Sequence, residues 1–310
     1  MLVASALAGC TMPEPQPSPT PAAAPAQAGA LLTWPNFLAR PRPAPDRTIR
    51  YGSDERQVVD VYLPQTPGPH PVVVLIHGGC WSAPWDRTLM NWAAHDLKQR
   101  GIAVWNIDYR VIQDGNGWPH VFDDTFAAIH ALAIEPVRSG DAELRRLDLN
   151  RVVAVGHSAG GHLGLWYAAR RRSWAPPPNV RMIPPPQLDA VISLGGLPDL
   201  DLAERPPGSG CGTEVIGQLI GRGQPGRDNP LADTSVPLMG PLGVRQVLIN
   251  GTEDRIIPTF FAEDYAGKMR AQCDDVRVRL IPRTGHVELI APESAAWAAA
   301  VEEIERALAR

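Results

Sequence analysis

The chain has 310 residues, of which 44% are hydrophobic and 20% charged, and this composition is sufficient for the core of one large domain. Its formal net charge is -4 at pH 7, so the composition gives no reason to expect a nucleic-acid partner. Beyond the N-terminus, no segment holds the ~20 consecutive apolar residues that a membrane-spanning helix needs.

The first 10 residues form a short run of apolar and small side chains that ends in Cys10. Residues 7–10 read LAGC, which is similar to the lipobox at which bacterial lipoproteins are cleaved and lipidated, although no basic residue precedes the run. Residues 11–46 follow as a Pro/Ala-rich tether and lead-in. This pattern predicts an exported protein tethered to a membrane through Cys10. The alternative is an accidental cysteine in a cytoplasmic protein.

An exported protein can form disulfides. If Cys10 is lipidated, the remaining cysteines are Cys80, Cys211 and Cys273, and three cysteines cannot all pair with one another. We expect Cys211 to pair with Cys273, because both lie in the late part of the chain. Sequence alone does not settle the connectivity.

From residue 47 onward, apolar strands alternate with helical patterns. After two short strands within residues 47–63, the expected strands cover residues 72–76, 102–109, 152–155, 188–194, 245–250 and 276–281. The expected helices cover residues 89–100, 119–133, 159–172, 213–220, 259–271 and 293–309. We therefore predict an α/β fold over residues 47–310, with a mostly parallel central sheet and helices on both faces. The glycine- and proline-rich stretch at about residues 199–242 is expected to be a small cap-like insertion.

A serine stands at the sharpest of the expected strand-to-helix turns. Residues 156–160 read GHSAG, which fits the G-x-S-x-G nucleophile elbow. Small residues at these positions let the turn present the hydroxyl of Ser158 at the N-terminus of the following helix, where the helix dipole favours negative charge. Taken alone, the pattern also fits a glycine-rich turn that cradles a phosphate.

A nucleophilic serine needs a base, which is usually a histidine oriented by a carboxylate. In this arrangement of strands and helices the acid and then the base follow the serine in the chain. Only His162 and His286 follow Ser158, and His286 is our candidate because it comes just after an expected strand. Asp254 also follows a strand and is the candidate acid, with Asp199 in reserve.

The same site needs backbone N–H groups for the negative charge that develops on the substrate oxygen. Residues 77–81 read HGGCW directly after an expected strand. We expect the oxyanion donors to be the amides of Gly79, Cys80 and Ala159. The other motif residues expected around the site are His77, Gly78, Trp81 and His157. This mechanism requires no metal and no cofactor.

The motifs HGGCW, GHSAGGHLG, GTEDRIIP and TGHVELI, in this order, resemble those of the α/β-hydrolase superfamily over about residues 47–310. Within it, HGG-x-W together with GHSAGGH is similar to kynurenine formamidase-like and carboxylesterase-like members. The resemblance implies hydrolysis of an ester or an aryl formamide through an acyl-enzyme. It implies catalytic roles for Ser158, Asp254 and His286, and it says little about the substrate.

Three hypotheses for the function follow. The first is a serine hydrolase that cleaves small carboxylic esters through an acyl-enzyme. The second is an aryl formamidase, or a hydrolase of small amides or peptides, with the same residues. The third is a tethered binding lipoprotein without activity, which predicts that a member of the Ser-Asp-His set is missing, and none is missing.

Overall fold

The computed structural model describes residues 30–176 and 182–309. The predicted lipobox, its Cys10 and most of the Pro/Ala-rich tether lie outside the described residues. In the part of the chain that the structure describes, no helix is long and apolar enough to cross a membrane.

The described chain builds one eight-stranded sheet in the order β1-β2-β4-β3-β5-β6-β7-β8. The strands are β1 (Arg47–Arg50), β2 (Val58–Tyr62), β3 (His70–Ile76), β4 (Ala103–Ile107), β5 (Leu147–His157), β6 (Ala190–Leu194), β7 (Arg245–Gly251) and β8 (Val276–Ile281). β1 and β2 pair in antiparallel fashion at one edge, and all pairs from β4 to β8 are parallel. The predicted mostly parallel sheet is therefore confirmed.

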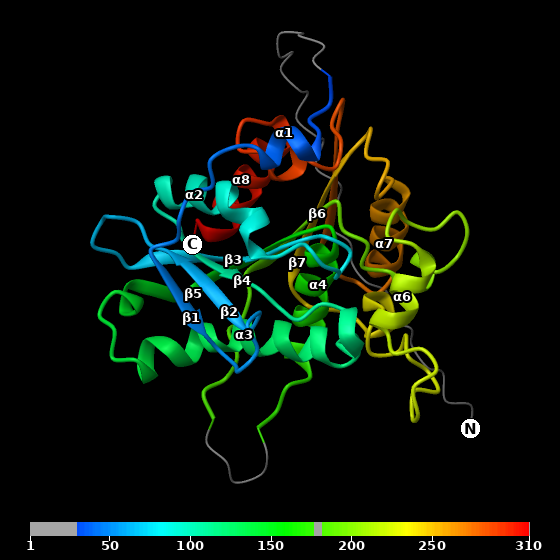
Figure 1. The fold of residues 1–310 in the computed structure, drawn as a ribbon, viewed down its shortest axis with the longest axis horizontal. Coiled ribbons are helices and arrows are strands. Elements are labelled where there is room, and N and C mark those ends of the chain that lie inside the picture. The colour runs from blue at the N-terminus through cyan, green and yellow to red at the C-terminus, as the bar shows by residue number, and fades with distance from the viewer. Residues whose placement is uncertain (1–29, 177–181, 310) are drawn as a thin grey trace, which may run out of the picture.

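Helices cover both faces of this sheet (Figure 1). The α-helices are α1 (Trp34–Leu38), α2 (Asn91–Gln99), α3 (His120–Arg138), α4 (Ala159–Arg172), α5 (Leu200–Ala203), α6 (Thr213–Leu219), α7 (Phe260–Arg270) and α8 (Ala295–Leu308). The short 3-10 turns are η1 (Arg87–Met90), η2 (Gln113–Gly115), η3 (Leu144–Arg146), η4 (Val236–Leu238) and η5 (Glu288–Ile290). Helices α1, α2 and α8 lie on one side of the sheet, and α3 lies on the other.

The strand β3 shows why the sheet carries two cores. Its residues Val72, Val74 and Ile76 are buried in a cluster with side chains of α3, α4 and α7. The alternate residues Val73 and Leu75 are buried in a second cluster with side chains of α1, α2 and α8. Because successive side chains of a strand point to opposite faces, a strand covered on both sides must be apolar throughout.

The parallel strands end at one edge of the sheet, and the residues that follow them carry the candidate chemistry. Gly79 follows β3, Ser158 follows β5, Gly195 follows β6, Asp254 follows β7 and His286 follows β8. In open α/β sheets this carboxyl edge is where ligands bind.

The described segment before β1 packs against the domain. We call residues 30–46 the N-terminal arm. Thr33 caps α1 by accepting a hydrogen bond from the amide of Asn36, and Phe37 is fully buried with its ring centre 4.4 Å from that of Trp92. Helix α1, within the expected lead-in, therefore contributes Phe37 to the core of the domain.

The expected insertion at residues 199–242 contains the short helices α5 and α6 and the turn η4. Ile216 and Leu219 of α6 are fully buried, and the amide of Val236 donates to the carbonyl of Pro198 at 3.1 Å. The insertion is thus anchored to the domain by buried side chains and backbone bonds.

Candidate active site

Ser158 occupies the turn between β5 and α4 with φ 53° and ψ -120°, a backbone conformation that non-glycine residues rarely adopt. The glycines around it leave no room for side chains. A Cβ on Gly156 would lie 2.0 Å from the carbonyl oxygen of Gly160, and one on Gly160 would lie 2.1 Å from that of Ile76. The close approach of strand, turn and helix explains the spacing of the GHSAG motif.

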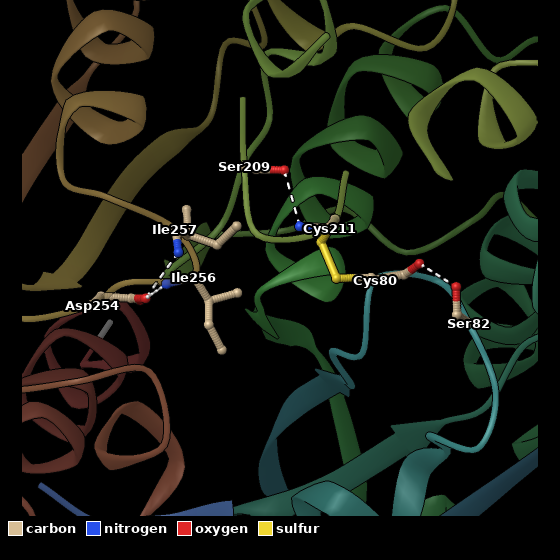
Figure 2. Close-up of a disulfide and its surroundings, with 7 residues drawn as sticks. All are labelled: Cys80, Ser82, Ser209, Cys211, Asp254, Ile256 and Ile257. Atoms are coloured by element: carbon tan, nitrogen blue, oxygen red, sulfur yellow. Dashed lines mark hydrogen bonds between the residues drawn. A yellow bond between two sulfur atoms is a disulfide. The ribbon is translucent and has the colours of Figure 1, made fainter. Parts of the chain in front are cut away.

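His286 and Asp254 form a buried hydrogen-bonded pair, with Nδ1 of the histidine 2.6 Å from Oδ2 of the aspartate. The side chains are only 5% and 0% exposed, respectively. The other carboxylate oxygen of Asp254 accepts hydrogen bonds from the amides of Ile256 and Ile257, each at 2.9 Å (Figure 2). Both oxygens are thereby engaged, which fixes the carboxylate on the imidazole.

Two contacts bring this pair next to the nucleophile turn. The ring centre of His157, the residue before Ser158, lies 4.5 Å from that of His286. The amide of Ser158 donates to the carbonyl of Leu194 at 2.8 Å, and a Cβ on the next residue, Gly195, would lie 3.1 Å from Nδ1 of His286. The structure thus gathers the predicted serine, acid and base at the ends of neighbouring strands.

His157 itself has a supporting position. Its Nε2 donates to the backbone carbonyl of His286 at 3.1 Å, so it links the nucleophile turn to the loop of the candidate base. Burial, together with the neighbouring His286, lowers the pKa of His157 well below its ordinary value. A neutral His157 adds no positive charge beside the candidate base.

The loop after β3 lies directly against the nucleophile. A Cβ on Gly78 would be 2.9 Å from Cβ of Ser158. Three successive residues, Gly79, Cys80 and Trp81, have φ of 110°, 51° and 53°. The loop therefore folds back sharply, and the side chain of Trp81 is fully buried beneath it.

The amides expected to hold an oxyanion are found around this turn. Ala159 is the first residue of α4, so its N–H belongs to the helix-terminal amides that have no partner within the helix. Gly79 and Cys80 lie in the neighbouring loop after β3. Helix N-termini and such loops are sites where backbone donors stabilise developing negative charge.

His77 holds the start of that loop in position. Its Nε2 lies 3.2 Å from Oδ1 of Asp108, and its ring stacks on Tyr109 with centres 4.2 Å apart. The hydroxyl of Tyr109 donates to the carbonyl of His77 at 2.9 Å. Burial alone would raise the pKa of Asp108, but the hydrogen bond and charge of His77, with Arg56 nearby, hold it below its ordinary value. His77 therefore positions the loop, whereas His286 is the histidine that binds Asp254.

The two rejected or reserve candidates lie elsewhere. Asp199 caps α5 through Leu202 and forms an ion pair with Lys268 of α7 at 2.5 Å, so its carboxylate joins the insertion to α7. Nε2 of His162 lies 2.8 Å from the carbonyl oxygen of Thr234. Burial lowers the pKa of His162 to about 4.

The disulfide prediction was wrong. Cys211 forms its disulfide with Cys80 and not with Cys273, and the Cα atoms of Cys80 and Cys211 are 5.4 Å apart (Figure 2). The insertion folds back over the loop after β3, which brings together residues 131 positions apart in sequence. Next to the disulfide, the amide of Gly210 donates to the carbonyl of Ile256 at 2.7 Å. A candidate oxyanion residue is thus tied covalently to a segment that also touches the Asp254 turn.

Sequence reasoning missed the N-terminal arm as part of this region. The ring centre of Trp34 lies 6.4 Å from that of His286 and 5.1 Å from that of Trp85. A local signal existed, because Thr33 followed by Pro35 is typical of a helix start. Nothing local in the sequence indicates that this helix lies beside the site.

With this geometry in place, comparison with known proteins identifies its relatives. The BD-FAE family model matches residues 59–268. A probable isoprenylcysteine α-carbonyl methylesterase from Oryza sativa is 31% identical over 121 residues, a match that covers 38% of this chain and 27% of that protein. The match therefore spans only about a quarter of the length of this plant relative.

Solved structures with a similar fold cover most of the chain. A carbohydrate esterase from gut microbiota, in a truncated form, has a TM-score of 0.70 and 18% identity and covers 87% of this chain and 100% of its own. A structure of esterase B from Lactobacillus rhamnosis with a tributyrin phosphonate has a TM-score of 0.67 and 18% identity, covering 88% and 90%. At these identities the likeness shows the fold, which is that of the α/β-hydrolases.

Proposed function

The chain belongs to the BD-FAE family within the α/β-hydrolase superfamily, and from that premise we propose that it is a serine hydrolase that cleaves carboxylic esters. The observation that carries the proposal is the His286–Asp254 hydrogen bond beside a serine in a strained strand-to-helix turn. A buried pair of this kind, adjoining a nucleophile elbow, is the arrangement that activates a serine hydroxyl.

The chemistry follows from the proton positions. The Nδ1–H of His286 donates a hydrogen bond to Asp254, which keeps its charge, and Nε2 is left unprotonated and able to take the proton of the Ser158 hydroxyl. The oxygen attacks the ester carbonyl carbon, and the amides of Gly79, Cys80 and Ala159 stabilise the resulting oxyanion. The C–O bond to the alcohol then breaks, and His286 gives the alcohol its proton.

The second half of the reaction uses the same groups. The acyl group remains bound to Ser158 as an ester. A water molecule gives a proton to His286 and attacks the acyl carbon, and the tetrahedral intermediate collapses to release the carboxylic acid. His286 returns the proton to Ser158, so the enzyme is restored without any external reactant but water.

The choice of an ester over an amide is supported by the relatives. The plant protein with 31% identity carries the name methylesterase, and the similar solved structures carry the name esterase. The same residues would also suffice for an aryl formamide or a small amide, so the substrate panel must include one.

The test compares p-nitrophenyl acetate, a longer-chain p-nitrophenyl ester and N-formylkynurenine with wild type, Ser158→Ala and the exposed control Ser173→Ala. We expect both esters to be hydrolysed, with kcat/KM reduced at least about 10³-fold in Ser158→Ala and unchanged in the control. Faster turnover of N-formylkynurenine than of either ester would favour the formamidase. No turnover of any substrate by the folded protein would favour a binding protein.

We also propose that the protein is exported and tethered through a lipidated Cys10. The lipobox-like LAGC sequence supports the tether, and the Cys80–Cys211 disulfide supports export, since disulfides persist in oxidising compartments. Membrane fractionation of bacteria that express the full chain and its Cys10→Ser variant tests this. We expect the wild type in the membrane fraction and the variant outside it, and equal distribution would contradict the tether.

A further inference from the structure

Two half-buried tryptophans, Trp34 and Trp85, stand beside the candidate active site without taking part in the chemistry described above. The ring centre of Trp34 lies 6.4 Å from that of His286 and 6.1 Å from that of His157. The centres of the two indoles are 5.1 Å apart. Together they form an apolar surface that begins at the candidate base.

Trp34 is held in place by the hydrogen bonds of the N-terminal arm on either side of it. The amide of Leu32 donates to the carboxylate of Glu288, which lies just after the candidate base in the chain. On the other side of α1, the carbonyl of Pro41 accepts a hydrogen bond from Nε1 of Trp92 at 2.9 Å. An indole fixed in this way can serve as a preorganised binding surface.

Trp85 extends the surface to the loop after β3. A Cβ on Gly79 would lie 2.3 Å from Cβ of Trp85, so this tryptophan packs directly on the loop of the candidate oxyanion donors. Its backbone carbonyl accepts a hydrogen bond from Arg56 at 2.9 Å. The indole pair therefore reaches from the oxyanion loop to His286.

The position beside His286 decides which part of the substrate the pair can meet. In acyl-enzyme formation the base must give its proton to the departing alcohol oxygen. The alcohol oxygen of the substrate must therefore lie within hydrogen-bond reach of His286, and the indole of Trp34 is a direct neighbour of that imidazole, with ring centres 6.4 Å apart.

We propose that Trp34 and Trp85 form the subsite for the alcohol part of the substrate and favour alcohols that carry a flat aromatic ring. The inference rests on the proposed ester hydrolysis at Ser158. Aromatic rings bind to indoles by stacking or edge-to-face contact, which contributes energy beyond the burial of apolar area.

The surroundings of the pair favour an aromatic ring over a sugar. Hydroxyl groups need hydrogen-bond partners when they are buried. Of the neighbouring carboxylates, Glu288 uses both oxygens to accept from the amides of Leu32 and Gly285, and Asp86 uses Oδ1 to accept from the amide and hydroxyl of Thr88. The indole surface itself offers apolar contact.

The experiment keeps the acyl group constant and varies the alcohol. Phenyl acetate, ethyl acetate and a glucose monoacetate pass through the same acetyl-enzyme, so a change confined to one alcohol reports binding of that alcohol. We compare each ester between wild type and Trp34→Ala, which cancels the intrinsic reactivity of the leaving group. We expect kcat/KM for phenyl acetate to fall about tenfold and that for ethyl acetate to fall less than about twofold.

Two further variants separate a specificity role from a structural one. Trp34→Phe keeps an aromatic ring and should recover most of the activity on phenyl acetate. Trp174→Ala removes another half-buried tryptophan, whose ring contact is to His130 and not to the site residues, and should leave all three esters unchanged. Thermal unfolding of each variant checks that the N-terminal arm stays packed.

If Trp34→Ala lowers kcat/KM equally for all three esters, or for none of them, the proposal is overturned. A larger loss for the glucose ester would assign the subsite to a sugar, and a loss that follows acyl length in a second series would assign it to the acyl group. Labelling of wild type and Trp34→Ala by a fluorophosphonate distinguishes these results from failure of the proposed function. Absent labelling of wild type would refute ester hydrolysis itself.

Discussion

The His286–Asp254 pair and Leu289 leave no room for even a methyl group on Gly195. Its φ is +58°, and a Cβ there would lie 2.6 Å from a methyl of Leu289, 3.1 Å from Nδ1 of His286 and 3.2 Å from Oδ2 of Asp254. We predict that Gly195→Ala lowers kcat at least about tenfold, because a small displacement of the acid–base pair is costly in rate. Ester hydrolysis under saturating substrate measures this.

Gly243→Ala is the matched control for that change. Gly243 has a similar φ of +66° but nothing within 4 Å of the added Cβ, so it carries the backbone strain alone. Both variants should lose stability, and only Gly195→Ala should lose kcat. Equal kcat losses in the two variants would show that strain, and not contact with the pair, is responsible.

At the residue scale, the G-x-S-x-G motif nominates Ser158 from sequence, and chain order with elimination nominates Asp254 and His286. Few histidines follow the elbow, and strand ends of a parallel sheet converge at one edge. Trp34 and Trp85 could not be found in this way. Their position depends on how the N-terminal arm folds back, and a half-buried tryptophan has no local pattern that distinguishes it from a core residue.

At the scale of elements, the Cys80–Cys211 disulfide joins the loop after β3 to the insertion. It closes a loop of 131 residues in sequence, so its loss should lower the free energy of unfolding by about 2–4 kcal/mol. We predict that Cys211→Ala also lowers kcat about tenfold with a smaller change in KM, because the amide of Cys80 loses its fixed position. Denaturant unfolding and steady-state kinetics measure the two effects.

Ser209→Ala is the control, since Ser209 accepts a hydrogen bond from the amide of Cys211 without taking part in the disulfide. It should affect both quantities only slightly. If Cys211→Ala is less stable but keeps the full kcat, the disulfide stabilises the fold and does not position the oxyanion loop.

The same scale shows what local patterns can predict. The strand expected at residues 245–250 forms as β7 within one residue, because an apolar strand between glycine- and proline-rich stretches is visible locally. The pairing of Cys80 with Cys211 was not predictable, because it depends on the path of an insertion that lacks a regular pattern. The strand expected to begin at residue 152 begins five residues earlier, at Leu147 of β5, for a similar reason. Its first residues, from Leu147, are mixed in polarity and are held by pairing with His70 and Pro71 of β3.

For the whole molecule, two buried histidines make the free energy of unfolding depend on pH. Burial lowers the pKa of His162 to about 4 and lowers that of His157 well below its ordinary value. The unfolded chain takes up these protons near the usual histidine pKa of about 6.5, whereas the folded chain does not. The free energy of unfolding should therefore fall as the pH drops below about 6.5, by at most about 1.4 kcal/mol per pH unit for each histidine.

Denaturant unfolding between about pH 7 and pH 5 measures this dependence. His162→Gln keeps a donor for the Thr234 carbonyl and removes the titration, so its stability should decline less steeply than that of wild type. His95→Gln, at an exposed position on α2, is the matched control for replacing a histidine by glutamine. If the free energy of unfolding changes equally with pH in wild type and His162→Gln, protonation of His162 does not cause the dependence.

Mapping the residue that reacts with an activated phosphonate tests directly whether Ser158 is the nucleophile. We would treat the folded protein with a fluorophosphonate and map the adduct by mass spectrometry, alongside Ser158→Ala and Asp254→Asn. We predict one adduct per chain, located on Ser158, absent in Ser158→Ala and formed much more slowly in Asp254→Asn. A folded protein that forms no adduct, or one that is modified at another residue, would contradict a serine hydrolase built on Ser158, His286 and Asp254.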